Sequence, residues 1–224
     1  MSKTKNIVIR ETKDGSTTLY ISEMDETYHS SHGAIQEAKH VFIKNGLELI
    51  DKDSIDVLEV GFGTGLNALL TCDFSFRTQK LVHYVGLETV PLSEELISKL
   101  NYLSHDPKLS PIHFNQIHSS QWEKKVKIHD FFSAEKNNIS VQEYQAESNF
   151  DIIFYDAFGP RAQQEMWQRE IFEKLFETIR VGGMLVTYCA MGQFKRDLRS
   201  IGFEVQNVPG PPGKREMTIA RKLS

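Results

Sequence analysis

The sequence predicts an α/β fold in which helices cover both faces of a mostly parallel sheet that ends in an antiparallel edge. From residue 56 onward, short apolar runs alternate with helical patterns, the order expected of parallel strands joined by helices. The first run leads directly into a glycine-rich turn at residues 61–65. The last two runs, at 203–206 and 217–220, are joined by a short Pro-Gly loop, and strands joined so closely must run antiparallel.

An N-terminal extension over residues 1–50 is expected to pack on the main domain. Residues 7–9 and 18–21 are rich in β-branched and aromatic side chains and flank an Asp-Gly turn signal, so they predict a hairpin. A polar stretch follows, and then a helical pattern at about 34–45 that a glycine ends. The extension is therefore predicted to be a β-hairpin followed by one helix.

The main domain is expected over residues 51–224 and contains the sheet. Its seven strands are predicted at residues 56–60, 81–88, 126–130, 150–156, 184–188, 203–206 and 217–220. Helices are predicted after the glycine turn, from Pro91, at about 165–180 and from about Gln193, with Gly182-Gly183 ending the third of them. Residues 132–149 have no recognisable pattern and are left as a loop.

Composition and charge are those of a soluble globular protein. The chain has 224 residues, of which 40% are hydrophobic and 25% charged. It has no apolar run long enough to cross a membrane, and its polar N-terminus does not resemble a signal peptide, so a cytoplasmic location without a membrane partner is expected. A net charge of −4 argues against an indiscriminate nucleic-acid binder.

Basic residues are nevertheless concentrated near the C-terminus. Residues 195–224 hold seven Lys or Arg against three acids, a local net charge of +4. Such an end on an acidic body is typical of a phosphate-binding surface. A solvated helix face next to a charged edge strand is the alternative interpretation.

No metal site is predicted. Cys72 and Cys189 are too far apart in sequence for a disulfide framework or a zinc pattern, and two reduced thiols in the core are expected. His29 and His32 have the spacing of some metal ligands, but no matching Cys or His pair accompanies them.

The glycine turn predicts a ligand site. Glycines between a strand and a helix let the backbone turn tightly and approach a ligand closely. A dinucleotide fingerprint requires its third glycine where this chain has Leu66. The spacing here is Gly61-x-Gly63-x-Gly65, which is common in S-adenosylmethionine methyltransferases. A tight turn without any ligand is the alternative.

Acidic residues at the ends of apolar runs support this interpretation, because the carboxyl ends of parallel strands face the ligand crevice. Glu88 is placed to bind ribose hydroxyls, Asp130 the adenine amine, and Glu59 the loop amides or a methionine ammonium. A Rossmann-like S-adenosylmethionine methyltransferase fold is thus predicted. The predicted cofactor-binding residues are Glu59, Gly61, Phe62, Gly63, Thr64, Gly65, Asn67, Glu88, Asp130 and Asp156.

Asp156 is the predicted catalytic residue. It begins the segment Asp156-Ala157-Phe158-Gly159-Pro160, which resembles the Asp-Pro-Pro-Tyr type motif of enzymes that methylate amino nitrogens. Its carboxylate can orient an amine or take its proton, and the Phe158 ring can lie against a base. The alternatives are a helix cap or loop anchor for Asp156 and a plain core position for Phe158.

Together these features resemble the MnmC-type methyltransferases, called MnmD when the domain stands alone, over residues 24–221. Four blocks carry the resemblance: Tyr28-x-Ser30-x-x-Gly33-x-x-x-Glu37, Gly61-Phe62-Gly63-Thr64-Gly65-Leu66-Asn67, Asp156-x-Phe158-x-Pro160 followed by Met166-Trp167, and Gly213-Lys214-Arg215-Glu216-Met217. The second and fourth blocks are the most specific of these.

The resemblance implies a reaction on tRNA. The family methylates the exocyclic amine of 5-aminomethyl-(2-thio)uridine at the wobble position, giving 5-methylaminomethyl-(2-thio)uridine. No flavin fingerprint is present, so S-adenosylmethionine without FAD or metal is expected, with separate enzymes making the aminomethyl precursor. The implied partner is the tRNA anticodon loop. The residues expected to contact it are Tyr28, Ser30, Phe158, Pro160, Lys214 and Arg215.

Two other functions stay open at this point. The chain could methylate the amine of a small molecule or protein with the same cofactor residues, since only the acceptor differs. It could also be a non-catalytic Rossmann-like module that binds a nucleotide or RNA. The presence of the cofactor acids together with Asp156 disfavours this last possibility.

Overall fold

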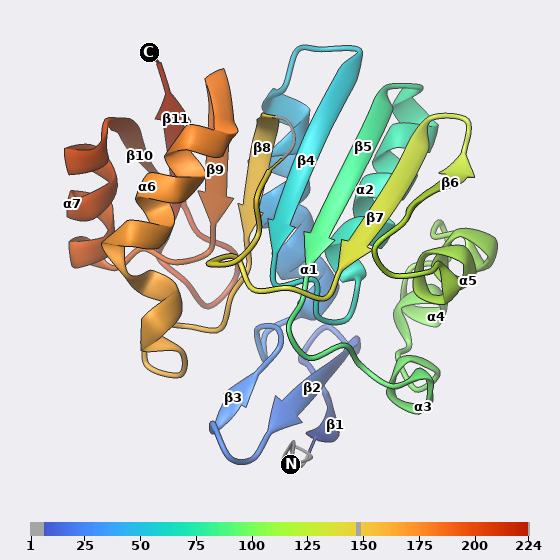
Figure 1. Cartoon of the computed structure of the whole chain (residues 1–224). Helices are drawn as coiled ribbons and strands as arrows, with labels where there is room; N and C mark the ends of the chain where they lie inside the picture. The colour runs from blue at the N-terminus through green and yellow to red at the C-terminus, as the bar shows by residue number, and fades with distance from the viewer. Residues whose placement is uncertain (1–6, 147–148, 224) are drawn as a thin grey trace.

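A computed structural model describes residues 7–146 and 149–223, and its centre is an eight-stranded sheet (Figure 1). The strand order is β10-β11-β9-β8-β4-β5-β7-β6. The five central strands run parallel, and antiparallel pairs close both edges. The strands are β4 (Ser54–Val60), β5 (Leu81–Leu87), β6 (Lys125–His129), β7 (Phe132–Asn137), β8 (Phe150–Tyr155), β9 (Ile179–Thr187), β10 (Phe203–Pro209) and β11 (Glu216–Lys222).

The prediction of a mostly parallel sheet is confirmed, but the count of seven strands is wrong. The additional strand is β7, which lies in the segment left as a loop and is the third parallel strand. Strand β6, predicted to occupy that place, pairs antiparallel with β7 at the edge. Because β7 has one buried and one partly exposed face, polar residues interrupt its apolar pattern and conceal the strand.

The predicted helix at 165–180 is shorter than expected. A 3₁₀ turn spans Gln164–Trp167 and α6 spans Arg169–Thr178. Strand β9 then begins at Ile179, so Gly182-Gly183 lies inside a strand and does not end a helix. The pairing of β8 with β9 shifts register there, which explains glycines within a strand.

Two hydrophobic layers cover the sheet. One contains side chains from α2 and α5 together with β4 and β5, and the other contains side chains from α6 and α7. The helices outside the N-terminal extension are α2 (Leu66–Thr78), α3 (Glu94–Ile97), α4 (Tyr102–His105), α5 (Pro111–Ser119), α6 and α7 (Gly192–Ile201). None of the helices within the described residues is long and apolar enough to cross a membrane.

The N-terminal extension forms its own small sheet. Strands β1 (Ile7–Glu11) and β2 (Thr17–Ile21) form the expected hairpin, and β3 (Glu26–Thr27) adds a third strand. The predicted helix is α1 (Ala34–Ala38), which continues as a π-helical segment, Lys39–Lys44, before a 3₁₀ turn at Leu47–Leu49. Figure 1 shows this sheet beyond the arrowheads of β4 and β5, at the carboxyl end of the parallel strands.

A charged cluster fixes the opposite end of the sheet. Asp151 on β8 is buried and accepts hydrogen bonds from the Asp56 amide (2.8 Å), Lys52 Nζ (2.6 Å) and an Arg180 guanidinium nitrogen (2.7 Å). Burial acts to raise the pKa of Asp151, but these hydrogen bonds and the Arg180 charge outweigh it and hold the pKa below its usual value.

Replacing Asp151 with Asn is expected to lower the free energy of unfolding by about 1.5–3 kcal/mol at pH 7, the usual worth of a hydrogen bond to a charged group. A carboxylate with a lowered folded pKa stabilises above its unfolded pKa, so the difference should shrink as pH falls below 3.8. Urea unfolding at neutral and acid pH measures this difference in the free energy of unfolding. The exposed Asp53→Asn is the matched control, and equal stabilities of the two variants at pH 7 would contradict the prediction.

Candidate active site

The glycine turn lies at the carboxyl end of the parallel strands, between β4 and α2. Gly61, Gly63 and Gly65 all have positive φ, at 92°, 49° and 70°. A Cβ on Gly61 would lie 2.7 Å from the backbone oxygen of Asp156. The turn therefore requires glycine both for its backbone angle and for its contact with the end of β8.

A cavity of about 790 Å³ opens beside this turn, and we call it the cofactor cavity. The walls of the cofactor cavity come from the glycine turn, the end of β5, the segments after β7 and β8, and the N-terminal extension. The lining residues from the predicted set are Gly61, Phe62, Gly63, Thr64, Asn67, Glu88 and Asp156. Gly65 is not among the lining residues and instead precedes the first turn of α2.

Glu88 lies at the rim of the cofactor cavity, directly after β5. Its two carboxylate oxygens accept hydrogen bonds from the Gly63 and Val90 amides, each 2.9 Å long. Phe62 is buried beside it, and a Cβ on Gly86 would lie 2.5 Å from the Phe62 ring. Gly86 thus makes room for the aromatic wall, a role that sequence reasoning missed because an isolated glycine in a strand has no distinctive pattern.

Asn67 links two acids through one amide group. Its Nδ2 donates to Glu59 Oε1 (2.8 Å) and to Asp156 Oδ2 (2.9 Å). Glu59 is fully buried behind Asn67 and does not line the cofactor cavity, so the prediction of direct cofactor contact is wrong. Burial raises the pKa of Glu59 well above its usual value.

The residues present fit S-adenosylmethionine. Asn67 lines the cavity, and its Oδ1 is buried without a hydrogen-bond partner among the described residues. Buried acceptors are nearly always hydrogen-bonded, and the ammonium group of a bound methionine moiety can donate the hydrogen bond that Asn67 Oδ1 lacks. Glu88 ends β5, where a carboxylate can face ribose hydroxyls. The glycine turn lets the backbone approach the rest of a nucleoside closely.

Asp156 ends β8 at the boundary between the cofactor cavity and a second cavity of about 1010 Å³, which we call the acceptor pocket. Burial and the Glu37 carboxylate raise the pKa of Asp156 to about 7, against the lowering effects of the Asn67 hydrogen bond and Lys214. A carboxyl group with this pKa exchanges a proton readily near neutral pH. The shared wall of the two cavities is Tyr28, His29, Asp156, Ala157 and Phe158.

The N-terminal extension supplies one side of the acceptor pocket. The Tyr28 ring meets the Phe158 ring edge-on at 5.0 Å between centroids. Ser30 lines the pocket, and its amide donates to Glu37 Oε2 (2.6 Å). His29 lines both cavities, and burial lowers its pKa to about 4, so this histidine is neutral at pH 7.

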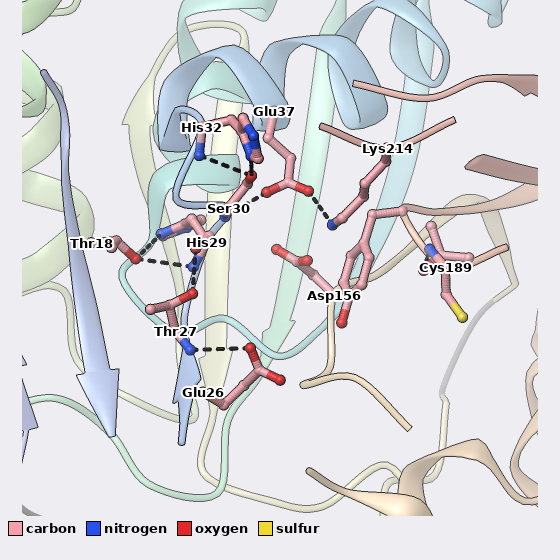
Figure 2. A network of polar contacts seen from close by, with 12 residues as sticks. Thr18, Glu26, Thr27, His29, Ser30, His32, Glu37, Asp156, Cys189 and Lys214 are labelled. Carbon is pink, nitrogen blue, oxygen red and sulfur yellow. Dashed lines mark hydrogen bonds and ion pairs between the residues drawn. The ribbon is translucent and has the colours of Figure 1, made fainter. Parts of the chain in front are cut away.

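Lys214 is placed differently from the prediction that it faces tRNA phosphates. Its ammonium pairs with Glu37 and lies 3.8 Å from the centroid of the Tyr188 ring, inside the acceptor pocket (Figure 2). Its neighbour Arg215 is exposed. Pro160 is half-buried and lines neither cavity. Of the predicted basic pair, Arg215 is exposed, whereas Lys214 is only partly exposed.

The prediction that Asp130 contacts the cofactor is wrong. Asp130 follows the antiparallel strand β6, and its exposed side chain pairs with Lys127 at 2.7 Å. It therefore lies where β7 begins, at the end of the sheet opposite the cofactor cavity. The segment that lines the cavity beyond the third parallel strand is instead Ile139, Ser140 and Val141.

A separate cluster brings together Cys72, His113 and His129, with one potential ligand atom of each within 4.8 Å of the others. His129 Nδ1 accepts the Phe131 amide hydrogen (3.1 Å), and its Nε2 faces the Cys72 carbonyl (3.2 Å). This pattern places the ring proton on Nε2, so neither nitrogen of His129 has a free lone pair. We interpret the cluster as a hydrogen-bonded packing contact.

Fold and site together define a Rossmann-like α/β protein that binds a nucleoside-containing ligand at the carboxyl ends of its strands. Residues 95–223 match the model of a family described as S-adenosyl-L-methionine-dependent methyltransferase. The chain belongs to this family, and S-adenosylmethionine is its cofactor.

Its relatives point to a narrower group. The chain is 30% identical over 220 residues to the tRNA 5-methylaminomethyl-2-thiouridine biosynthesis bifunctional protein MnmC of Cupriavidus metallidurans, covering 91% of this chain and 32% of that protein. It is 32% identical to the protein of the same name from Idiomarina loihiensis, covering 89% and 36%. The chain thus spans about a third of the length of these relatives.

Solved structures share the fold. The crystal structure of MnmC2 from Aquifex aeolicus has a TM-score of 0.79 at 24% identity and covers 100% of this chain and 72% of that one. Spermidine synthase from Thermotoga maritima has a TM-score of 0.60 at 15% identity, covering 100% and 71%. At these identities the likeness establishes the fold alone.

Proposed function

We propose that this protein methylates the exocyclic amine of 5-aminomethyl-(2-thio)uridine at the wobble position of tRNA, giving 5-methylaminomethyl-(2-thio)uridine. The observation that carries the proposal is the position of Asp156 at the boundary of the cofactor cavity and the acceptor pocket. The similarity to bifunctional MnmC proteins supports tRNA as the acceptor. Under this proposal, other enzymes supply the aminomethyl group.

The glycine turn and Glu88 would hold the cofactor, with Asn67 offering Oδ1 to its ammonium group. When bound, S-adenosylmethionine supplies a methyl group made electrophilic by a positive sulfur. Glu59 would act indirectly, because it orients the Asn67 amide from behind. Thr64 would be held in place by the Tyr102 hydroxyl, which donates to its Oγ1 at 3.0 Å.

The acceptor pocket has the charge expected of an amine site. Glu26, Glu37 and Asp156 line it, whereas Lys214 is the only Lys or Arg among the described residues that line it. Carboxylates attract a protonated amine, and methylation then requires that the amine lose a proton to expose its lone pair. Asp156 is the group placed to orient the amine and take that proton. The Tyr28 and Phe158 rings would lie against the pyrimidine.

The test compares tRNA bearing the aminomethyl group with the same tRNA lacking it, using labelled S-adenosylmethionine. After digestion, label should appear in 5-methylaminomethyl-(2-thio)uridine only for the first tRNA. Label transferred equally to both tRNAs, or to neither while a small-molecule or protein amine is methylated, would exclude the proposed acceptor.

Arg215→Ala is expected to weaken binding to all tRNAs by a similar factor and to reduce the slope of log K against log salt by about 1, as for one lost phosphate contact. Arg215 is exposed and directly follows Lys214, which lines the acceptor pocket. Lys124→Ala removes an equal charge from an exposed site before β6 and should leave the slope unchanged. Filter binding over a salt series measures both, and an unaltered slope for Arg215→Ala would argue against a phosphate contact there.

A further inference from the structure

The acceptor pocket contains an internal ion pair next to Asp156. Lys214 Nζ donates to Glu37 Oε1, although the two residues are 177 positions apart in sequence. The Glu37 side chain is 9% exposed and that of Lys214 is 32% exposed, so the carboxylate is buried and the lysine is partly exposed. Figure 2 shows the Lys214 ammonium and the Glu37 and Asp156 carboxylates turned toward one another.

Both members of the pair are held from more than one side. Glu37 uses its second oxygen to accept the Ser30 amide hydrogen, and Lys214 rests on the face of the Tyr188 ring. The Tyr188 hydroxyl in turn donates to the Ala157 carbonyl at 2.8 Å, directly beside Asp156. These contacts connect the lysine to the segment that carries the acceptor carboxylate.

The loop before Lys214 is shaped to bring it inward. Gly213 has φ of +86°, and a Cβ there would lie 2.4 Å from the His32 ring. The Pro209 carbonyl is 2.8 Å from His40 Nε2, which ties the start of the same loop to the helix after α1. Glycine at position 213 therefore lets the C-terminal loop pack against the N-terminal extension, and Lys214 points into the pocket.

Charged groups around Asp156 come from several elements. Glu37 contributes from α1, Glu59 from β4 and Lys214 from the loop before β11. Tyr84 on β5 and Tyr188 after β9 also interact with Asp156, and burial keeps both hydroxyls protonated. His29 is neutral at pH 7. Lys214 is thus the one cation among these groups, all of which belong to the described parts of the chain.

We propose that Lys214 is a positioning residue that keeps Asp156 in its anionic, proton-accepting form, while Glu37 holds the lysine in place and opposes its effect. This inference rests on the proposed function, in which Asp156 receives a proton from an amine. An opposite charge favours an ionised carboxylate and a like charge disfavours it. In this proposal Lys214 acts by stabilising the Asp156 carboxylate and does not bind tRNA phosphates.

Lys214 and Glu37 should change the pH at which Asp156 ionises in opposite directions. Lys214→Met removes the favourable charge, so the pH at which Asp156 ionises should rise by about 1, at the lower end of the usual effect of a neighbouring charge. Glu37→Gln removes the like charge and should lower that pH. The double variant Lys214→Met/Glu37→Gln removes both and should titrate close to the unmodified protein. A merely structural ion pair would give no such opposed shifts.

The titration can be followed without any acceptor. The ¹³C resonance of the Asp156 carboxyl carbon, identified by its loss in Asp156→Asn, reports ionisation directly in the 224-residue chain with S-adenosylmethionine. The acid limb of kcat/KM on aminomethyl-tRNA should move in step with it. Lys124→Met, which removes an exposed charge before β6, is the matched control and should change neither measurement.

Opposed shifts for the two single variants, with the double variant near the unmodified protein, would support the proposal. Shifts in the same direction, or no shift in a folded variant, would overturn it. If Lys214→Met fails to fold, the other two variants test the proposal. The pH at which Asp156 ionises should be lower in Glu37→Gln than in the unmodified protein and should be close to the unmodified value in the double variant. Absence of methyl transfer by the unmodified protein would instead count against the proposed acceptor and leave the NMR titration intact.

Discussion

Asp156→Asn is expected to lower the rate of methyl transfer by about 10²–10⁴-fold, the usual contribution of general base catalysis. The amide has nearly the same shape as the carboxylate but cannot take a proton from the acceptor amine. Affinity for S-adenosylmethionine should change much less, since the glycine turn and Glu88 remain. Single-turnover transfer of labelled methyl and calorimetric titration of the cofactor separate the two effects.

The pH dependence gives this prediction a second readout. Because the pKa of Asp156 is about 7 in the folded protein, kcat/KM should rise as pH increases through about 7, and this limb should be absent in Asp156→Asn. A carboxylate whose folded pKa is raised costs stability as pH rises above its unfolded pKa. The variant should therefore be no less stable than the unmodified protein at pH 8, and reduced turnover with a collapsed melting temperature would indicate misfolding instead.

Asp197→Asn is the matched control for this substitution. Asp197 is partly exposed on α7 and accepts a hydrogen bond from Gln193 away from both cavities. It should retain full turnover with an unchanged pH profile. Asp156→Asn that keeps more than about a hundredth of the normal rate would lie outside the range for a general base, and Asp156 would then only orient the amine.

Gly61→Ala is expected to weaken S-adenosylmethionine binding by at least about 10-fold, which corresponds to 1.4 kcal/mol. The new Cβ would lie 2.7 Å from the Asp156 backbone oxygen, so the turn and the end of β8 must separate. A left-handed conformation costs a non-glycine residue about 1–2 kcal/mol in addition. Cofactor calorimetry and thermal unfolding measure the two contributions.

Gly182→Ala distinguishes steric contact from backbone strain. Gly182 has φ of +84°, close to the 92° of Gly61, but a Cβ there would meet nothing within 4 Å. Gly182→Ala should therefore lower the stability of the protein through backbone strain alone and leave the affinity for S-adenosylmethionine unchanged. If both alanine variants lose stability equally and neither loses affinity, the contact of Gly61 with Asp156 has no role in shaping the cavity.

The sequence predicted most of the sheet because buried parallel strands are short, continuous apolar runs. Strand β7 escaped prediction because only Phe132 and Ala134 are apolar in Phe132-Ser133-Ala134-Glu135-Lys136-Asn137. The misplaced third strand then led to the wrong role for Asp130. An acid was expected at the carboxyl end of a parallel strand, whereas Asp130 follows an antiparallel one.

The site was predictable where its residues are local in sequence. The glycine turn, Glu88 and Asp156 each follow a recognisable strand, so the carboxyl-end rule places them together. Glu37 and Lys214 obey no such rule, since their pairing depends on how the C-terminal loop folds against α1. Their contact, like the indirect position of Glu59, emerges only when the chain is packed in three dimensions.

The shared amide of Asn67 limits how this enzyme can be redesigned. Both of its hydrogen bonds come from Nδ2, one to Glu59 in β4 and one to Asp156 after β8. An engineer who enlarges the first turn of α2 to admit a bulkier sulfonium donor will also move the hydrogen-bond donor of the acceptor carboxylate. Donor scope and acceptor reactivity therefore have to be optimised together in this scaffold, with compensating changes on β8.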